Sequence, residues 1–321
     1  MRFRIDKFVI AIIVAITLAY FFPQWGSAHS PLPLNAISTV GISLIFFFYG
    51  LKLSPSKLKA GLKNWKLHLL VQSSTFLLFP ALVLLARPFI HNAEQETLWL
   101  AFFFLAALPS TVSSSVVMVS LAKGNIPAAI FNASISGIIG IMITPLWMGF
   151  FVPPAQADFD FTEIYTKLIV QIIAPVILGL VLHPHWGDFA LKHSAQLTFF
   201  DKSIILLIIF KSFSDSFERR IFSTVSWLDL VLIFVSVLAL FFVVFALTGF
   251  LSKWLHLNVE DRITVQFCGT KKSLVHGTVF SKILFGQMSS LGMILLPLML
   301  FHATQILIIS IVATRWAARK A

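Results

Sequence analysis

Long apolar stretches separated by short polar segments dominate the chain. A helix of about 20 mostly apolar residues spans the hydrocarbon core of a bilayer, and ten stretches approach that length. This pattern predicts an all-α membrane protein with ten transmembrane helices. The predicted spans lie at about 7–23, 34–52, 65–88, 96–122, 125–151, 162–183, 198–217, 226–252, 259–284 and 288–314.

Composition supports the same class. Hydrophobic residues make up 58% of the 321 positions, charged residues only 12%, and Phe alone occurs 34 times, which is outside the range of soluble domains. The net charge is +11, but the basic residues are spread over short loops. Because nucleic-acid binding needs them on one folded face, we expect lipid and no nucleic acid as partner. Cys268 is the only cysteine, which excludes an intramolecular disulfide and a cysteine-based zinc cluster.

Basic residues between the predicted spans favour one orientation. Lys and Arg stay mainly in cytoplasmic loops, and with the N-terminus inside, fifteen fall on the inner side and four on the outer side. We therefore expect a multi-pass protein of the cell membrane with both termini cytoplasmic. The inner set is Arg2, Arg4, Lys7, Lys52, Lys57, Lys59, Lys63, Lys66, Lys123, Lys192, Lys253, Arg262, Arg315, Arg319 and Lys320; the outer set is Arg87, Arg219, Arg220 and Lys282, with acidic Asp158, Asp160 and Glu163 in the same outer loops.

Ten spans divide into two sets of five. Because each half has an odd number of helices, the second half has the opposite orientation in the membrane to the first. Two pairs of short segments support such inverted repeats: "MITPLWM" at 142–148 resembles "MILLPLML" at 293–300, and the polar "PSTVSSS" at 109–115 has a counterpart in "CGTKKS" at 268–273. Secondary transporters build their binding sites where two such interrupted helices meet. The sequence thus predicts broken fourth and ninth helices that cross near the midplane.

The fourth span carries unusual polarity. Pro109 removes a main-chain donor, and the hydroxyls that follow can satisfy freed main-chain groups or coordinate an ion. Alternatively, they only allow close helix packing. The candidate residues of the fourth and fifth spans are Thr111, Ser113, Ser114, Ser115, Asn132 and Ser134.

The ninth span contains Lys271 and Lys272 side by side. A lipid-facing lysine at the bilayer centre costs roughly 2.5–3.5 kcal/mol. Neighbours on a helix point about 100° apart, so at least one should face the protein interior. Gly269 and Thr270 indicate a bend there. Two structural alternatives are that the lysines are neutral, or that they pair with a carboxylate, for which the candidates are Asp215, Glu260 and Asp261.

Three segments resemble one transporter family. The run "SSSVVMVSLAKGNIPAAIFNASISG" is similar to the "TASNVMTYLARGN" crossing segment of the bile acid:sodium symporter family. "FCGTKKSL" resembles the ninth helix of that family's outlying branch, which contains sodium/bile acid cotransporter 7-like and many bacterial proteins, and "FFFYGLKLS" at 46–54 resembles its second-helix signature. The resemblance implies a panel domain at about 7–52 and 162–217, a core domain at about 65–151 and 226–314, and alternating access between them.

The chain departs from this family at its ion sites. Typical members hold two sodium ions behind the crossing, using an Asn on helix four and a Glu on helix nine. Here helix four reads Ser114, Ser115 and Val116, and the family's Glu-Val-Gly-Met-Gln-Asn is replaced by 267–272, "FCGTKK". The carboxylate is missing, and a nearby ammonium repels sodium by several kcal/mol at an effective dielectric near 20. The residues left for a sodium ion are Ser114, Ser115, Gln72 and Gln266.

These features predict a secondary active transporter of a small organic anion, with Lys271 or Lys272 in place of bound sodium. We expect no enzyme and no resident cofactor, with Na⁺ or H⁺ as the possible coupling ion. A non-transporting regulatory membrane protein on the same scaffold and a conventional sodium symporter stay open as alternatives. The predicted substrate and ion site comprises Gln72, Thr111, Ser113, Ser114, Ser115, Asn132, Ser134, Gln266, Thr270, Lys271, Lys272 and Ser273.

Overall fold

The computed structural model describes residues 7–27, 30–53, 64–111, 113–151, 161–220, 223, 225–286, 288 and 290–318. Several residues used in the sequence argument lie outside these ranges: Arg2, Arg4, Lys57, Lys59, Lys63, Asp158, Asp160, Arg319 and Lys320. The side chain of Ser113 is also outside the description.

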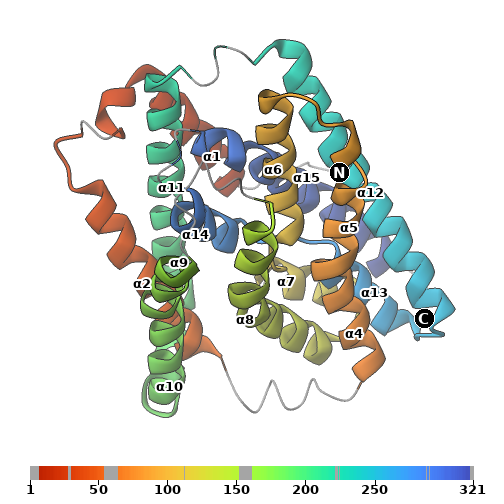
Figure 1. The fold of residues 1–321 in the computed structure, drawn as a ribbon. Helices are drawn as coiled ribbons and strands as arrows, with labels where there is room; N and C mark the ends of the chain where they lie inside the picture. The colour runs from red at the N-terminus through yellow and green to blue at the C-terminus, as the bar shows by residue number, and fades with distance from the viewer. Residues whose placement is uncertain are drawn as a thin grey trace. The chain divides into compact units, whose positions relative to one another are not determined.

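Every regular element of the described residues is helical, and none of them is a strand. The α-helices are α1 (Lys7–Phe21), α2 (Leu34–Lys52), α4 (Trp65–Ser73), α5 (Phe79–Leu84), α6 (Ala93–Ala107), α7 (Ser113–Leu121), α8 (Ile126–Gly149), α9 (Phe161–Leu168), α10 (Ala174–Lys192), α11 (Ser194–Glu218), α12 (Trp227–Trp254), α13 (Val259–Gly269), α14 (Leu274–Phe285) and α15 (Leu291–Ala317). Two π-helical segments, η2 (Ser74–Leu78) and η4 (Ile169–Ile173), and two short 3₁₀ turns, η1 (Pro23–Trp25) and η3 (Arg87–Phe89), complete the elements in Figure 1.

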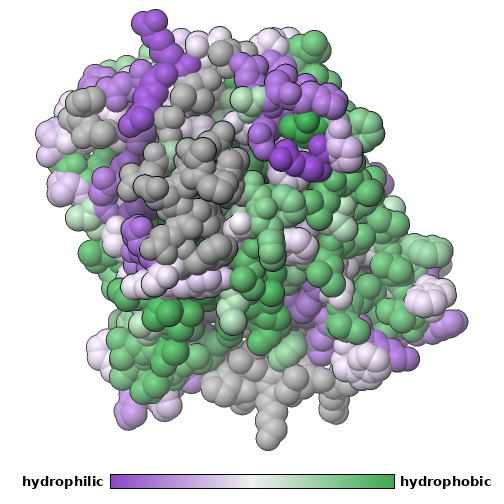
Figure 2. All heavy atoms as spheres, viewed as in Figure 1, coloured by the Kyte–Doolittle hydropathy of each residue, from purple (hydrophilic) through white to green (hydrophobic). Residues whose placement is uncertain are grey.

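Helix length and apolarity confirm a multi-pass membrane protein. Within the described residues, six helical stretches are long and apolar enough to cross a bilayer, and α1 is a shorter apolar helix. Much of the surface that faces the viewer in Figure 2 is hydrophobic, as expected for side chains in contact with lipid. The six stretches are Leu34–Lys52, Trp65–Phe89, Ile126–Gly149, Thr162–Lys192, Trp227–Trp254 and Leu291–Ala317.

The chain forms two compact units, each assembled from three segments. Unit 1 contains Met1–Ser54, Val152–Val225 and Thr278–Leu295. Unit 2 contains Pro55–Phe151, Ser226–Gly277 and Leu296–Ala321.

In unit 1, α2 and α10 pack at very short range through a pair of glycines. A Cβ placed on Gly50 would collide with the main-chain carbonyl of Val176, and one on Gly179 would collide with the carbonyl of Phe47. Small residues let helices approach closely in membrane proteins. These two positions therefore accept no side chain without moving the helix pair apart.

The α10 helix extends well beyond the predicted end of the sixth span. It continues to Lys192, and α11 begins at Ser194, where the sequence suggested a loop between 183 and 198. A run of apolar residues marks only the part of a helix that lies in lipid, whereas the main-chain ladder can continue into water. At the start of this extension, Nδ1 of His183 lies 2.7 Å from the carbonyl oxygen of Leu51, within hydrogen-bonding distance.

In unit 2, three helices begin close together around one carboxylate. Asn64, Asn125 and Asn258 are the N-cap residues of α4, α8 and α13, and the side chain of each accepts a hydrogen bond from its own helix. The amides of Asn64 and Asn125 also donate to the two carboxylate oxygens of Asp261, at 2.7 and 2.8 Å. Asp261 is buried, so it fixes the starts of α4, α8 and α13 against one another.

Candidate ion and substrate site

Two helix interruptions lie at the centre of unit 2, at the positions where the sequence predicts breaks. The first follows the end of α6 at 108–111, before α7, and the second separates α13 from α14 at 270–273. The main-chain N–H of Ser273 donates to the carbonyl of Pro109 at 2.9 Å, and the Ser110 hydroxyl donates to the carbonyl of Cys268 at 2.6 Å. The two interruptions therefore satisfy part of each other's main chain.

Space for the first interruption comes from a glycine on α8. A Cβ on Gly140 would lie 2.7–2.9 Å from the ring atoms of Pro109, which is closer than real Cβ contacts allow. On the same helix, Ser136 accepts from the N–H of Ser110 at 3.0 Å, and Thr144 donates to the carbonyl of Ala107 at 2.8 Å. The α8 helix thus holds the broken segment from one side.

The ammonium of Lys272 occupies a seat made of main-chain oxygens. Its Nζ lies 2.7 Å from the carbonyl oxygen of Thr75, 2.6 Å from that of Ala106 and 2.8 Å from that of Leu108. An ammonium carries three N–H donors, so these three acceptors match it in number. The ring of Phe79 faces the same nitrogen, 4.1 Å from its centroid, and adds a cation–π contact.

The Thr75 carbonyl lacks a main-chain donor in the π register because Pro80, in the first turn of α5, follows the π-helical segment η2. In the π register the N–H of Phe79 bonds the carbonyl of Ser74, five residues earlier. The next bond of that register would run from residue 80 to Thr75, but Pro80 has no N–H to donate. The carbonyl of Phe76, one residue further, accepts instead from the indole of Trp147 at 2.9 Å.

The other two oxygens of the seat belong to the end of α6. The last four carbonyls of a helix have no partner within it, and they carry the negative end of the helix dipole. Ala106 lies in that last turn and Leu108 directly follows it. Lys272 therefore supplies N–H donors to carbonyls that have no partner within α6, and it is fully buried in doing so.

Gln305 holds the main chain at Lys272 in place. Its side-chain oxygen accepts from the N–H of Lys272 at 2.8 Å, and its side-chain nitrogen donates to the carbonyl of Lys272 at 2.8 Å. Gln305 lies on α15 and is fully buried. It was not among the residues predicted from the sequence, although a single Gln in the apolar run "ATQILIIS" was a visible signal.

Lys271 is equally buried but makes fewer contacts. Its ammonium donates to the carbonyl of Ser114 at 2.8 Å and lies 3.5 Å from the hydroxyl of the same residue. In the described part of the chain, these are its only hydrogen bonds. The Lys271 ammonium therefore has an N–H donor left for another acceptor, whereas all three donors of Lys272 have acceptors.

The carboxylates proposed as partners of the two lysines are not their partners. Asp215 pairs with Lys211 at 2.8 Å, and Asp261 accepts from the capping asparagines. The ion pairs among the described residues include neither Lys271 nor Lys272. Both ammonium groups instead donate to main-chain carbonyls, Lys271 to that of Ser114 and Lys272 to those of Thr75, Ala106 and Leu108.

The remaining candidate residues divide into separate networks. The Gln72 amide donates to the side-chain and main-chain oxygens of Asn132, at 3.1 and 3.3 Å, and Asn132 contacts Nδ1 of His68 at 2.8 Å. Gln266 donates to the carbonyl of Phe245 on α12 at 3.0 Å. No hydrogen bond between described residues joins two of Gln72, Ser114, Ser115 and Gln266, the four left for a sodium ion.

Other predicted residues shape the edges of the two breaks. Thr270 donates to the carbonyl of Gln266 at the end of α13, and the Ser273 hydroxyl contacts Nδ1 of His276 at 2.9 Å in α14. The Ser114 hydroxyl lies 3.4 Å from that of Thr111. Ser115 and Ser134 are buried.

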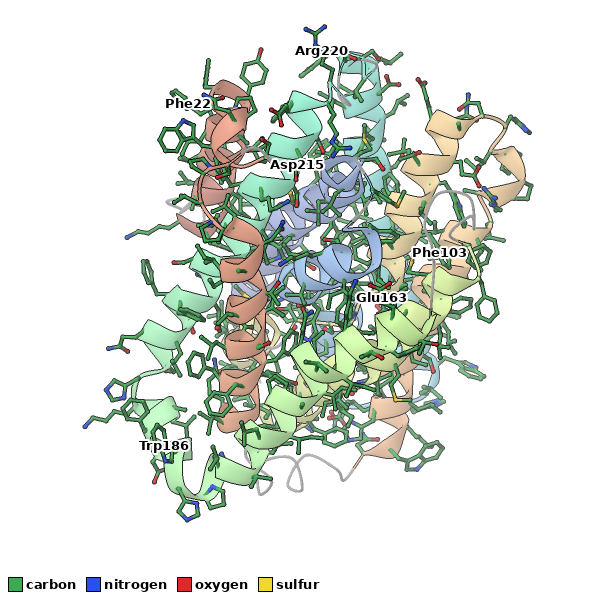
Figure 3. All side chains as sticks on the ribbon, turned by 60° about the vertical axis from the view of Figure 1, so that its left-hand side comes forward. Phe22, Phe103, Glu163, Trp186, Asp215 and Arg220 are labelled. Carbon is green, nitrogen blue, oxygen red and sulfur yellow. The ribbon has the colours of Figure 1, made fainter. Side chains whose placement is uncertain are left out.

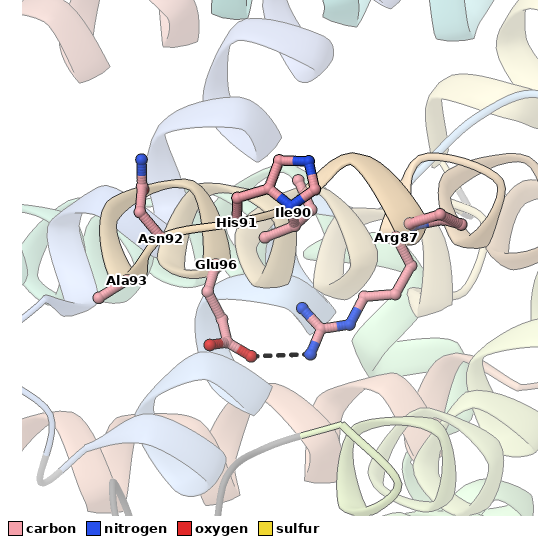
Figure 4. A pocket seen from close by; sticks show the side chains of 7 residues that line it. Arg87, Ile90, His91, Asn92, Ala93 and Glu96 are labelled. Carbon is pink, nitrogen blue, oxygen red and sulfur yellow. Dashed lines mark hydrogen bonds and ion pairs between the residues drawn. The ribbon is translucent and has the colours of Figure 1, made fainter.

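A polar hollow of about 500 Å³ lies at the other end of α6 (Figure 4). Its walls carry an ion pair of 2.8 Å between Arg87 and Glu96, and the guanidinium of Arg87 lies 4.7 Å from the ring centroid of Trp99. Glu96 is in the first turn of α6 and Ala106 is in its last, about 15 Å apart along the helix. This hollow is therefore separate from the lysine site.

Comparisons with known proteins confirm the resemblance seen in the sequence. The model of the SBF-like CPA transporter family matches residues 6–318. YfeH of Escherichia coli strain K12, whose name describes a candidate symporter, is 36% identical over 98% of this chain and 94% of its own length. Sodium/bile acid cotransporter 7 of Danio rerio is 32% identical over 97% of this chain and 93% of its own length. The relatives carry transporter names, so the chain is not an enzyme: it is a multi-pass membrane protein that belongs to the SBF-like CPA transporter family.

Proposed function

We propose that this protein is a secondary active transporter of a small organic anion, in which the ammonium of Lys272 takes the place of a bound coupling cation. Membership of a transporter family supports transport as the activity. The observation that carries the proposal is the seat of three carbonyl oxygens around Lys272 Nζ, at 2.6–2.8 Å. Transporters use such carbonyls, at unwound segments and helix ends, to coordinate sodium or protons.

The charge at this seat argues against a second cation beside it. A sodium ion near the two lysines would be repelled by several kcal/mol for each close contact at an effective dielectric near 20. Sodium also prefers oxygen ligands with negative charge, and the Glu of typical family members is absent from 267–272. An ammonium attached to the chain would supply the positive charge in every state of the transport cycle. The place where the two interrupted helices meet would then be stabilised without a bound cation from solution.

Lys271 is the residue that we assign to the substrate. Its ammonium has one close carbonyl, that of Ser114, and one longer bond to the Ser114 hydroxyl, so at least one of its three donors is available for a carboxylate or sulfonate. Ser114 lies in the first turn of α7, where the positive end of the helix dipole favours an anion. We therefore expect Lys271 and the start of α7 to bind the anionic group.

The transport cycle that we propose is alternating access in a scaffold of two inverted five-helix repeats. We propose that unit 1 is the panel domain and unit 2 the core domain, with both termini cytoplasmic, although unit 1 also contains Thr278–Leu295, which the resemblance assigns to the core. The two breaks, the lysines and the Asp261 cluster all lie in unit 2. The core would thus carry the charged site as one body.

The test is uptake of labelled organic anions by proteoliposomes, with and without a sodium gradient. We expect uptake that does not depend on sodium in the wild type, and loss of uptake in Lys272→Ala. Adding propylammonium, which restores the missing cation, should recover part of the activity. Lys282→Gln serves as the matched control for removal of a lysine from a span. Uptake that requires sodium in the wild type would refute the tethered-cation proposal.

A conventional sodium symporter is the second candidate, because several relatives are named sodium/bile acid cotransporters. It predicts that a sodium gradient drives accumulation and that Gln72→Ala and Ser115→Ala raise the sodium concentration needed. A non-transporting regulatory protein predicts no flux of any anion under either gradient. The same proteoliposomes separate the three outcomes.

A further inference from the structure

A groove runs along unit 1 between α1 and α11. Its volume is about 610 Å³, and each wall is one face of a helix. The residues on α1 recur at helical spacing from Lys7 to Leu18, and those on α11 recur in the same way from Ser203 to Phe210. The groove is lined by Lys7, Ile10, Ala11, Val14, Ala15 and Leu18 from α1, and by Ser203, Leu206, Leu207 and Phe210 from α11.

The two helices run in the same direction, so the groove has a defined polar end. Lys202 of α11 lies over the ring of Phe8 in α1, and Tyr20 of α1 contacts Phe217 of α11 with ring centroids 5.4 Å apart. Phe22 directly follows α1, Asp215 lies in the last turn of α11, and Arg220 follows α11. Figure 3 shows these three residues at the same end of the helix pair. The beginning of both helices is therefore the other end, where Lys7 lies.

Small side chains leave the space in the groove. Ala11 and Ala15 lie on the α1 face at positions where a larger residue would fill it, and Ala15 is buried. The neighbouring Ile10, Val14 and Leu18 remain 46–49% exposed. An apolar channel with exposed walls in a membrane-spanning protein is a seat for a hydrocarbon chain.

The length and charge of the groove select the kind of lipid. From Lys7 to Leu18 the helix rises about 16 Å, close to half of the ~30 Å hydrocarbon core and hence to one leaflet. Two lysines mark its polar end: Lys7 lines it, and Lys202 has its Nζ 5.0 Å from the Phe8 ring centroid. The nearby Asp201 is paired with Lys52 at 3.5 Å, and no ion pair among the described residues includes Lys7 or Lys202.

We propose that this groove binds one acyl chain of an anionic phospholipid, whose phosphate contacts Lys7 and Lys202. The sequence before α1 adds Arg2 and Arg4, consistent with attraction to an anionic leaflet. Occupancy of this groove in unit 1 would therefore depend on the anionic lipid content of the membrane.

The test measures lipid retained by the purified full-length chain. The protein is exchanged into detergent with equal amounts of phosphatidylglycerol and phosphatidylcholine of the same chain length, and retained lipid is counted by native mass spectrometry. A basic residue near the membrane surface changes affinity about fivefold. The double change of Lys7→Gln and Lys202→Gln should therefore lower the preference for phosphatidylglycerol by about 25-fold. Ala11→Phe, which fills the groove, should reduce retention of both lipids.

Matched controls are Lys253→Gln for the loss of a basic residue and Ile13→Phe for a ring added outside the groove. Both should behave as the wild type, and uniform thermal stability across the set shows that each variant is folded. Equal retention of the two lipids by the wild type would overturn the proposal. So would a dimer mass that disappears in Ala11→Phe, since the groove would then be a subunit interface.

Discussion

The side-chain amide of Gln305 bonds both the N–H and the carbonyl of Lys272, each at 2.8 Å. It supplies to one residue of the broken helix the two main-chain partners that a continuous helix would have supplied. The orientation of the lysine side chain toward its carbonyl seat depends on this pair of bonds.

Replacing Gln305 should therefore destabilise the second interruption. In Gln305→Leu, two buried main-chain groups of Lys272 lose their partners, at about 1–3 kcal/mol for each. Gln305→Glu keeps the acceptor for the N–H of Lys272 but places a carboxylate oxygen against the Lys272 carbonyl. The loss of stability in this variant should therefore be larger at alkaline pH, where the carboxylate is ionised. At acidic pH the protonated carboxyl donates a hydrogen bond and part of the stability returns.

The measurement is thermal unfolding of the purified protein in detergent across a pH series. Thr304→Val is the control, because the Thr304 hydroxyl bonds only carbonyls of its own helix, those of Leu300 and Phe301. Equal melting temperatures for Gln305→Leu and the control would contradict the assigned role.

The two neighbouring lysines should differ sharply in their effect on stability. Lys272→Met leaves three buried carbonyls unpaired, at about 1–3 kcal/mol each, whereas Lys271→Met removes the partner of one. We expect a much lower melting temperature for the first variant than for the second. The affinity for the substrate, measured per folded molecule, should show the opposite order. Lys271→Met should lose more affinity than Lys272→Met. Thermal unfolding with and without a bound anion gives both quantities, and similar effects of the two variants would be inconsistent with the different contacts.

Gly140 should tolerate no side chain. In Gly140→Ala the new methyl group collides with the Pro109 ring, 2.7–2.9 Å away, and overpacking of this kind typically costs about 1–3 kcal/mol. Gly269→Ala is a matched control at the other interruption, since its new methyl would meet Ser74 Cβ at 3.3 Å and nothing closer. Expression level and melting temperature should fall for Gly140→Ala and change little for Gly269→Ala.

Asp261 should stabilise unit 2 through three helix starts at once. Asp261→Ala leaves the amides of Asn64 and Asn125 without their acceptor, and we expect a loss of about 2–4 kcal/mol from two buried donors. Glu260→Gln, one residue earlier and exposed, keeps the backbone and tests a charge change alone. Limited proteolysis of the folded protein should detect fraying of α4, α8 and α13 in the first variant only; identical protease patterns would exclude the clamp.

Much of the membrane fold could be predicted from apolar periodicity, because lipid contact requires long runs of Phe, Leu, Ile and Val. The interruptions were also predictable, since Pro109 and Gly269 both weaken a helix within such a run. The extension of α10 to Lys192 was not, because helical hydrogen bonding continues where apolarity ends. The meeting of three N-caps at Asp261 depends on tertiary packing, and no local pattern encodes it.

The sequence predicted that at least one of Lys271 and Lys272 faces the protein interior, and both are buried, but it did not predict which groups their ammonium ions contact. Two adjacent lysines in an apolar span required a special environment, and the sequence pointed to carboxylates or hydroxyls as their partners. The structure supplies carbonyls instead, and a carbonyl has no signature of its own in a sequence. Pro80 was the available clue: a proline within a span frees an oxygen four or five residues earlier.

Because the seat around the ammonium is built from the peptide backbone, ordinary substitutions at Thr75, Ala106 and Leu108 cannot delete its oxygens. The identity of the occupant consequently depends on the side chain at residue 272, which Gln305 holds in place. A short side chain at that position would leave the same oxygens open to a dissolved metal ion. If the ammonium takes the place of a coupling cation as proposed, one substitution at residue 272 would make occupancy of these oxygens depend on the salt concentration.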